Sequence, residues 1–231
     1  MRTTLFTDSV LHGRSESFEV FVHPSPHSTA IIINYPGYNG HIDGYNNKYR
    51  TLGAHLSKLG VGAFIQMPNT IWDRGMDYGH TLIDDLLSTC NYAKKIAGHV
   101  CKTLEPNLYL MGFSAGAGGV AGAAYHSGAK KILLMAPSAD AALQDVTKSL
   151  SHYSGEVYVV IGKNDDVVGP DAGKRFYNMA TAASKRMLVE LPECDHQFRG
   201  TKNGKILSKA PIWAFVGDRT FPSPEDGLEL Y

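Results

Sequence analysis

The sequence has 231 residues, of which 43% are hydrophobic and 19% charged, and this length and composition predict one globular domain with a sizeable core. Lys plus Arg and Asp plus Glu both number 22, so the charge balance indicates no preference for nucleic acid or for acidic substrates. The N-terminal segment lacks a secretion signal, no apolar stretch approaches the roughly 20 residues that span a bilayer, and the three cysteines lack metal-ligand spacing. We therefore expect a soluble cytoplasmic protein with no membrane association, metal or cofactor.

The first part of the chain predicts a hairpin, a buried strand and an amphipathic helix. Residues 3–10 and 16–23 are β-prone runs joined by a short segment, which favours an antiparallel hairpin. The run 29–35 is apolar in character, as expected of a strand buried on both faces. Apolar side chains then recur at steps of three and four, which predicts a helix that Gly60 ends. These side chains are Tyr45, Tyr49, Leu52, Leu56 and Leu59.

The rest of the chain alternates between predicted strands and helices, which indicates a mostly parallel sheet with helices on both faces. The expected strands are 61–67, 108–113, 131–136, 157–161 and 186–191. The expected helices are 83–97, 115–124, 139–150, 171–183 and 204–216. The helix at 115–124 is mostly Gly and Ala, so it is tolerable only if it packs very close to the sheet, and we expect it to be the central helix. The tail 222–231 is expected to lie on the surface or to be left free.

A Gly-x-Ser-x-Gly motif lies where the strand 108–113 meets this small-residue helix. Gly112 and Gly116 flank Ser114 at a distance of two residues. In a tight strand-to-helix turn that holds a serine in a strained backbone conformation, these two positions have no room for a Cβ atom. The pentapeptide arises by chance in roughly one chain in ten of this length. The indication of a nucleophile therefore depends on its position between a predicted strand and a predicted helix.

A second interpretation of the same residues is a dinucleotide-binding turn. The segment 116–121 fits the Gly-x-Gly-x-x-Ala fingerprint, and Asp140 lies about where a ribose-binding acid would follow. The register argues against this interpretation, because the fingerprint needs its first glycine directly after the strand. Gly116 comes four residues after Gly112 and falls inside the predicted helix.

The chain resembles a small α/β-hydrolase over nearly its whole length. In that family the oxyanion loop follows the third strand, the nucleophile the fifth, the acid the seventh and the histidine the eighth. The strand count, made here from periodicity, puts a candidate at all four places. The resemblance implies a three-layer α/β-hydrolase fold with a mostly parallel eight-stranded sheet.

The resemblance also implies a Ser-Asp-His triad. Ser114 would be the nucleophile, and His196 would be the base because it is the only one of ten histidines after the predicted seventh strand. The segment 162–168 resembles the family's Gly-x-x-Asp-x-Val pattern, which aligns Asp165 with the acid that orients the histidine. A shift of one residue in this loop would put Asp166 in that role. Asp195 is too near His196 in sequence to orient it easily, and we expect it to be solvated.

The segment 36–40 is expected to form the oxyanion loop. It replaces the His-Gly start found in many family members, but the function depends on backbone N–H groups, which would come from Tyr38 and from Ala115. An Asn-Gly hairpin turn is the alternative interpretation, but a predicted helix rather than a strand follows.

The layout favours an open site in a single domain, 1–231. Residues 137–156 separate the sixth and seventh strands, the usual place of a cap domain in the family, and are too few to build one. Gly37, Trp72 and Val167 are the expected substrate-binding residues. Cys194, beside the candidate histidine, is expected to be a half-buried bystander.

This open and mildly apolar site favours hydrolysis of small or medium esters or thioesters through an acyl-enzyme. The chain is similar in size to dienelactone-hydrolase-like proteins and short carboxylesterases, although the former use Cys where this chain has Ser114. Amide or lipid hydrolysis and acyl transfer share the same machinery. A binding module on an inactive hydrolase fold is a further alternative.

Overall fold

The computed structural model describes residues 1–9, 14–69, 78–139, 143–223 and 227–230. Eight strands form one sheet in the order β1-β2-β4-β3-β5-β6-β7-β8. The strands are β1 (Arg2–Ser9), β2 (Arg14–His23), β3 (Ala30–Tyr35), β4 (Ala63–Gln66), β5 (Asn107–Phe113), β6 (Lys131–Met135), β7 (Glu156–Gly162) and β8 (Lys185–Leu191). The helices are η1 (Tyr45–Asn47), α1 (Lys48–Lys58), α2 (Tyr78–Val100), α3 (Ala115–Ser127), α4 (Leu143–His152), α5 (Ala172–Met179), α6 (Thr201–Gly204) and α7 (Ile206–Phe215).

The sheet is parallel except at its N-terminal edge. Strands β1 and β2 form the predicted antiparallel hairpin, and β2 also pairs antiparallel with β4. From β4 through β3, β5, β6 and β7 to β8, every neighbouring pair is parallel. The predicted fold class is therefore confirmed, and the carboxyl ends of six strands lie along one edge of the sheet.

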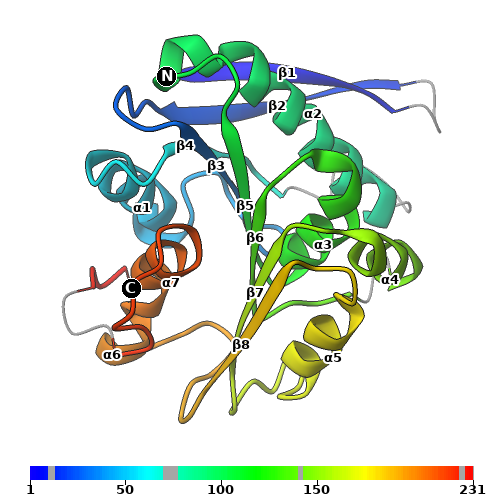
Figure 1. The fold of residues 1–231 in the computed structure, drawn as a ribbon, viewed down its shortest axis with the longest axis vertical. Helices are drawn as coiled ribbons and strands as arrows, with labels where there is room; N and C mark the ends of the chain where they lie inside the picture. Colours follow the sequence, from blue (N-terminus) through cyan, green and yellow to red (C-terminus); the bar gives the residue numbers. More distant parts are fainter. Residues whose placement is uncertain (10–13, 70–77, 140–142, 224–226, 231) are drawn as a thin grey trace.

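Helices cover both faces of the sheet (Figure 1). In this view α1, α6 and α7 lie on one side, and α2, α3, α4 and α5 lie on the other. Each side has its own apolar core, one containing Leu52, Leu56 and Ala210 and the other Leu86, Val120 and Phe176. Strand β3 lies between these layers, and all six of its residues are buried, as its apolar run predicts.

Helix α3 is the predicted central helix, and its small residues allow it to approach the sheet. Every residue from Gly116 to Ala124 is buried. A Cβ atom at Gly118 would overlap the carbonyl oxygen of Ser138, and one at Gly119 would lie 3.0 Å from the ring of Tyr35. The helix can therefore lie this close to its neighbours only because these positions carry no side chain.

The predicted bounds of several helices are wrong at their ends. Tyr45 and Leu59 are exposed because α1 proper covers only residues 48–58, with Tyr45 in the preceding η1 turn. Residue 139 is not helical, α4 extends to His152, and α5 ends at Met179 rather than at 183. The last predicted helix, 204–216, corresponds to α7, and the short helix α6 that precedes it was not predicted. Periodicity identifies the buried middle of a helix better than its ends.

The described residues of the C-terminal arm pack against α7, which agrees with the first of its two predicted arrangements. Phe221 and Leu230 are buried in the core beneath α7, and the Ser208 hydroxyl donates a hydrogen bond to the Leu228 carbonyl at 3.2 Å. In the part of the chain that the structure describes, no helix is long and apolar enough to cross a membrane.

Candidate active site

Four loops meet at the carboxyl edge of the sheet. Because β3, β5, β7 and β8 are parallel to one another, the segments that follow them emerge on the same side. Ser114 directly follows β5, Asp165 lies three residues after the end of β7, and His196 lies five residues after the end of β8. Ser114 and His196 are 82 residues apart in the chain, and the topology brings them into contact.

Ser114 has the strained backbone conformation that the motif predicts. Its φ and ψ are 54° and −122°, outside the regions that L-residues usually adopt, at a cost of about 1–3 kcal/mol. The turn is held by its backbone: the Ser114 N–H donates to Met135 O at 2.9 Å, and the Ser114 carbonyl accepts from the N–H groups of Ala117 and Ser138 at 3.0 and 3.1 Å. Its side chain remains partly exposed at the top of β5.

A continuous hydrogen-bond chain joins Ser114, His196 and Asp165. Nδ1 of His196 lies 2.8 Å from Oδ2 of Asp165, and Nε2 lies 3.1 Å from Oγ of Ser114. A carboxylate can only accept, so Nδ1 carries the proton and donates it to Asp165. In the neutral imidazole Nε2 is then unprotonated and accepts the hydrogen bond from the Ser114 hydroxyl. This is the tautomer that a histidine needs in order to take a proton from a serine.

The loop after β7 places Asp165 inward and Asp166 outward. Asp165 is 1% exposed, and its Oδ1 accepts hydrogen bonds from the N–H groups of Val167 and Val168, both at 3.0 Å. Asp166 is exposed. Of the two carboxylates that the sequence left as alternatives, the structure brings only Asp165 to His196.

The loop after β8 is organised by Asp195, which is partly exposed to solvent and has a structural role that the sequence did not reveal. Its Oδ1 accepts hydrogen bonds from the N–H groups of Gln197 and Arg199, at 3.2 and 3.0 Å, and its Oδ2 pairs with the Arg199 guanidinium. Partial burial opposes ionisation of Asp195, but the hydrogen bonds from Arg199 prevail and lower the pKa of its carboxyl group. This carboxylate therefore closes a turn around His196.

Cys194, which directly precedes Asp195, is fully buried and not half-buried as expected. Burial, with the nearby Asp195 and Asp165 carboxylates, raises the pKa of its thiol to about 12. A thiol with this pKa stays protonated near neutrality, so Cys194 does not react as a thiolate. Among the described residues, no group of three or more His, Cys, Asp or Glu side chains could hold a metal ion.

The loop after β3 lies beside Ser114. A Cβ atom at Gly37 would lie 3.2 Å from the Cβ of Ser114 and 3.1 Å from the ring of Phe113. Gly37 and Gly40 close a turn with a 2.9 Å hydrogen bond, and the Tyr38 side chain is exposed. Ala115 is the first residue of α3, where N–H groups have no partner within the helix. The two backbone N–H groups predicted from the sequence thus belong to segments that adjoin the Ser114 side chain.

Asn69 holds this loop in place, and sequence reasoning missed it. Its side-chain amide donates to Pro36 O at 3.0 Å, and its backbone N–H donates to Gly40 O at 2.9 Å. The Asn69 side chain is 2% exposed. The only sequence signal was its place just after β4, whose carboxyl end lies at the same edge of the sheet.

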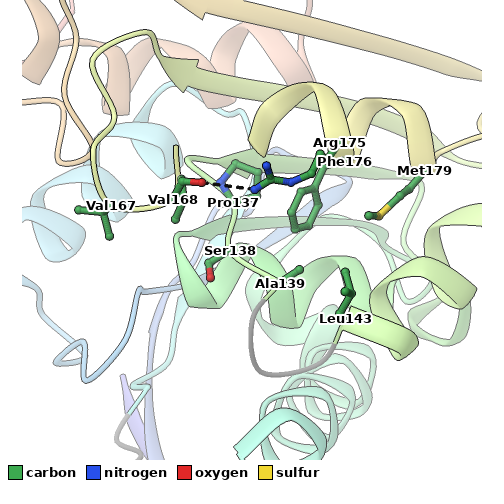
Figure 2. A pocket seen from close by; sticks show the side chains of 9 residues that line it. All are labelled: Pro137, Ser138, Ala139, Leu143, Val167, Val168, Arg175, Phe176 and Met179. Atoms are coloured by element: carbon green, nitrogen blue, oxygen red, sulfur yellow. Dashed lines mark hydrogen bonds between the residues drawn. The ribbon is translucent and has the colours of Figure 1, made fainter. Parts of the chain in front are cut away.

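A cleft of about 500 Å³ lies beside the Ser114 turn (Figure 2). Val167, one of the expected substrate-binding residues, lines it, and the backbone of Ser138 connects it to Ser114 through the hydrogen bond described above. Trp72, the third predicted substrate-binding residue, lies outside the described residues. The cleft walls also come from α4 and α5, which sequence reasoning did not assign to the site. They are Pro137, Ser138, Ala139, Leu143, Val167, Val168, Arg175, Phe176 and Met179.

The structure agrees with the argument against a dinucleotide-binding turn. Gly116 lies inside α3, and a Cβ atom there would overlap the carbonyl oxygens of Tyr35 and Pro36. Close packing against β3 and its loop, and not the approach of a pyrophosphate, therefore accounts for this glycine. Asp140 lies outside the described residues.

No protein-family model matches this sequence, and a comparison with curated proteins found no match. Solved structures do match it. A dienelactone hydrolase from Anabaena variabilis ATCC 29413 superposes with a TM-score of 0.72 at 16% identity, covering 92% of this chain and 96% of that one. The esterase domain of a Rhodothermus marinus protein gives 0.66 at 13% identity, covering 92% and 97%. An α/β serine hydrolase homologue from Coxiella burnetii gives 0.62 at 19% identity, covering 85% and 89%.

This chain has the α/β-hydrolase fold. The three neighbours match along nearly the whole of their own lengths, so the similarity extends over the complete arrangement of the sheet and its helices. At identities below 20% the likeness is one of backbone architecture. A shared fold does not identify the functional side chains, which depend on the geometry of this chain's own site.

Proposed function

We propose that this protein is a serine hydrolase that cleaves carboxylic esters or thioesters of small to medium size through an acyl-enzyme. The observation that carries the proposal is the hydrogen-bond chain from Ser114 Oγ through His196 to Asp165. The esterase and hydrolase names of the structural neighbours support the same class of reaction. Each part of the site has a chemical role in this scheme.

Ser114 would attack the substrate carbonyl while Nε2 of His196 takes its proton. The imidazolium that forms is stabilised by the Asp165 carboxylate at Nδ1. The same proton then passes from Nε2 to the leaving alcohol or thiol, which departs and leaves the acyl group on Ser114. Water repeats the sequence: His196 takes a proton from it, hydroxide adds to the acyl carbonyl, and Ser114 leaves with the proton returned.

The negative charge on the carbonyl oxygen would be bound by the N–H groups of Ala115 and Tyr38. Their segments adjoin Ser114 on either side, at the start of α3 and in the loop after β3. A donor fixed in advance costs no reorganisation during the reaction, and removal of one such donor from other hydrolases lowers kcat by about 10² to 10³. Asn69 would act here as a positioning residue, because it holds Pro36 and Gly40 at the two ends of the loop.

The site would be open and the chain a single domain. Between β6 and β7, the described residues contain one helix, α4, in place of a cap. A reducing compartment such as the cytoplasm fits the cysteines, since Cys90, Cys101 and Cys194 are all buried free thiols. We expect no cofactor, since every step above uses groups of the chain and water.

Loss of Ser114 tests the proposal most directly. Ser114→Ala removes the nucleophile and His196→Ala the base, so each should lower kcat for p-nitrophenyl esters by about 10⁴ to 10⁶, and the double variant should be little worse than either. A fluorophosphonate probe should label the wild type and not Ser114→Ala. A binding module on an inactive fold predicts the opposite result, with neither labelling nor turnover in the wild type.

A further inference from the structure

The cleft beside Ser114 is mostly apolar, and one charged side chain, that of Arg175, lines it. Its walls are mostly aliphatic and aromatic, with Leu143, Phe176 and Met179 at the end contributed by α4 and α5. Ser138 and Arg175 are its polar residues. An apolar pocket with a few placed polar groups is the usual form of a small-molecule site, in which the polar groups set the specificity.

Arg175 is attached to the same loop that holds Asp165. Its Nη2 donates a hydrogen bond to the Val168 carbonyl at 3.3 Å, and the Val168 N–H donates to Oδ1 of Asp165 at 3.0 Å. Figure 2 shows the guanidinium directed from α5 toward Val168 and Pro137, across the cleft from Ser138. Two hydrogen bonds therefore connect the guanidinium to the carboxylate that orients His196.

Acidic residues near α5 pair with a different cation. Lys174, the preceding residue, lies 3.5 Å from Glu190 and 3.9 Å from Asp171. Among the described residues that line the cleft, none is acidic. The positive charge of Arg175 thus faces a cleft whose own walls supply no carboxylate.

The two sides of Ser114 belong to different layers of the fold. Phe113, which packs against the His196 ring, and Phe198, which packs against Phe113, belong to the core under α1 and α7. Phe176 and its neighbours in the cleft belong to the core under α2 to α5. Because Nε2 of His196 must reach the leaving oxygen, the alcohol part of a substrate would lie toward His196, which leaves the cleft to the acyl chain.

We propose that the substrate carries a carboxylate on its acyl part, bound in this cleft by Arg175. The inference rests on the proposed hydrolase activity and names its substrate class. An aliphatic chain would lie against the apolar walls and extend its acid to the guanidinium. The planar fork of an arginine can bind a carboxylate through two parallel hydrogen bonds, which a lysine ammonium cannot do.

A matched pair of esters tests this directly. Mono-p-nitrophenyl glutarate and p-nitrophenyl pentanoate differ only in that a carboxylate replaces the terminal methyl group, so the ratio of their kcat/KM values isolates the acid. We expect the wild type to prefer the glutarate, and Arg175→Gln to lower that ratio by about tenfold, the size of one partly solvated charged hydrogen bond. Arg175→Lys should retain part of the preference. Lys174→Gln removes a neighbouring charge outside the cleft and should leave the ratio unchanged.

Other outcomes would overturn the inference without touching the proposed activity. Turnover of the pentanoate with no preference for the glutarate would do so, as would an equal loss of preference in Lys174→Gln. A third such outcome is a preference for a carboxylate only when it is attached to the alcohol part of the ester. The pair 3-carboxyphenyl pentanoate and phenyl pentanoate tests this. That result would point to Lys48, whose ammonium lies 5.7 Å from the centre of the Phe113 ring, the same ring that packs against His196. Failure of every ester and of fluorophosphonate labelling would instead remove the proposed function itself.

Discussion

The turn that carries Ser114 and the loop that carries Asp165 lie at the same edge of the sheet, but different forces hold them. The Ser114 turn is fixed by close backbone packing, since a Cβ atom at Gly116 would overlap the carbonyl oxygens of Tyr35 and Pro36. The Asp165 loop is fixed by a side chain, whose carboxylate accepts hydrogen bonds from Val167, Val168 and His196.

This difference decides what each segment tolerates. The Ser114 turn tolerates no added side chain at Gly116, because a Cβ atom there would have to displace the backbone at the end of the central strand β3. A loop held by one carboxylate tolerates changes at its exposed positions, such as Asp166 and Val167, but depends on that single group. Substitutions in each segment can therefore test whether backbone packing fixes the Ser114 turn and whether one carboxylate fixes the Asp165 loop.

Among substitutions that test this comparison, the largest effect is expected from Asp165→Asn. The amide would favour the wrong histidine tautomer, with Nε2 protonated and unable to accept from Ser114, so kcat should fall by about 10² to 10⁴. Asp166→Asn is the matched control and should change kcat less than tenfold, since Asp166 is exposed. Steady-state rates on a p-nitrophenyl ester measure both variants. The reverse ranking, with both proteins folded, would show that the loop uses the other carboxylate.

A smaller effect, on stability, is expected from Gly116→Ala. The added methyl group has to displace the backbone of β3 or α3, which should lower the free energy of unfolding by about 3 kcal/mol. Gly122→Ala is the control in the same helix: its Cβ would lie 2.8 Å from Cδ1 of Ile83, the flexible end of a side chain. The better helix propensity of Ala offsets that contact, so the change should stay within about 1 kcal/mol.

Urea unfolding curves compare these two glycine variants. Equal stability of Gly116→Ala and Gly122→Ala would contradict the claim that backbone packing fixes the Ser114 turn. A loss confined to Gly116→Ala, together with reduced labelling by a fluorophosphonate, would confirm it. The pair thus separates the cost of any added methyl group in α3 from the cost at the turn itself.

The smallest effect is expected from Asp195→Ala, which extends the comparison to the loop after β8. Loss of the hydrogen bonds to the Gln197 and Arg199 N–H groups should lower the free energy of unfolding by about 1 kcal/mol at neutral pH. The pKa of Asp195 is lowered in the folded state, so its contribution is present above the unfolded value of 3.8 and is lost as pH falls through the folded value. The wild type and variant should therefore converge in stability under strongly acidic conditions.

Thermal unfolding of both proteins across the acidic range checks this sign. Arg199→Gln keeps the carboxylate and its two backbone bonds, so it should destabilise less than Asp195→Ala. A difference between wild type and Asp195→Ala that grows on acidification would show that the carboxylate acts by some route other than these hydrogen bonds.

The sequence predicted the strands better than the helix ends and the loops. All eight strands were predicted, and the clearest signal came from central strands such as β3, because a parallel strand covered on both faces has to be apolar along its length. The ends of α4 and α5 were wrong, because a solvent-facing helix end leaves little mark on the apolar pattern. The loop-organising role of Asp195 was missed for a related reason: hydrogen bonds to nearby backbone groups do not depend on any periodicity that a sequence displays.

By itself, the sequence determined the order of strands and helices and the place of Ser114 at a strand-to-helix turn. These follow from local rules, namely the apolar periodicity of each element and the need for small residues around a strained turn. Only the tertiary structure decided which carboxylate reaches His196, that Asn69 holds the loop after β3, and that Arg175 faces the cleft. Those three are contacts between separate strand ends and helices, and a parallel sheet brings such segments together at one edge however far apart they lie in the chain.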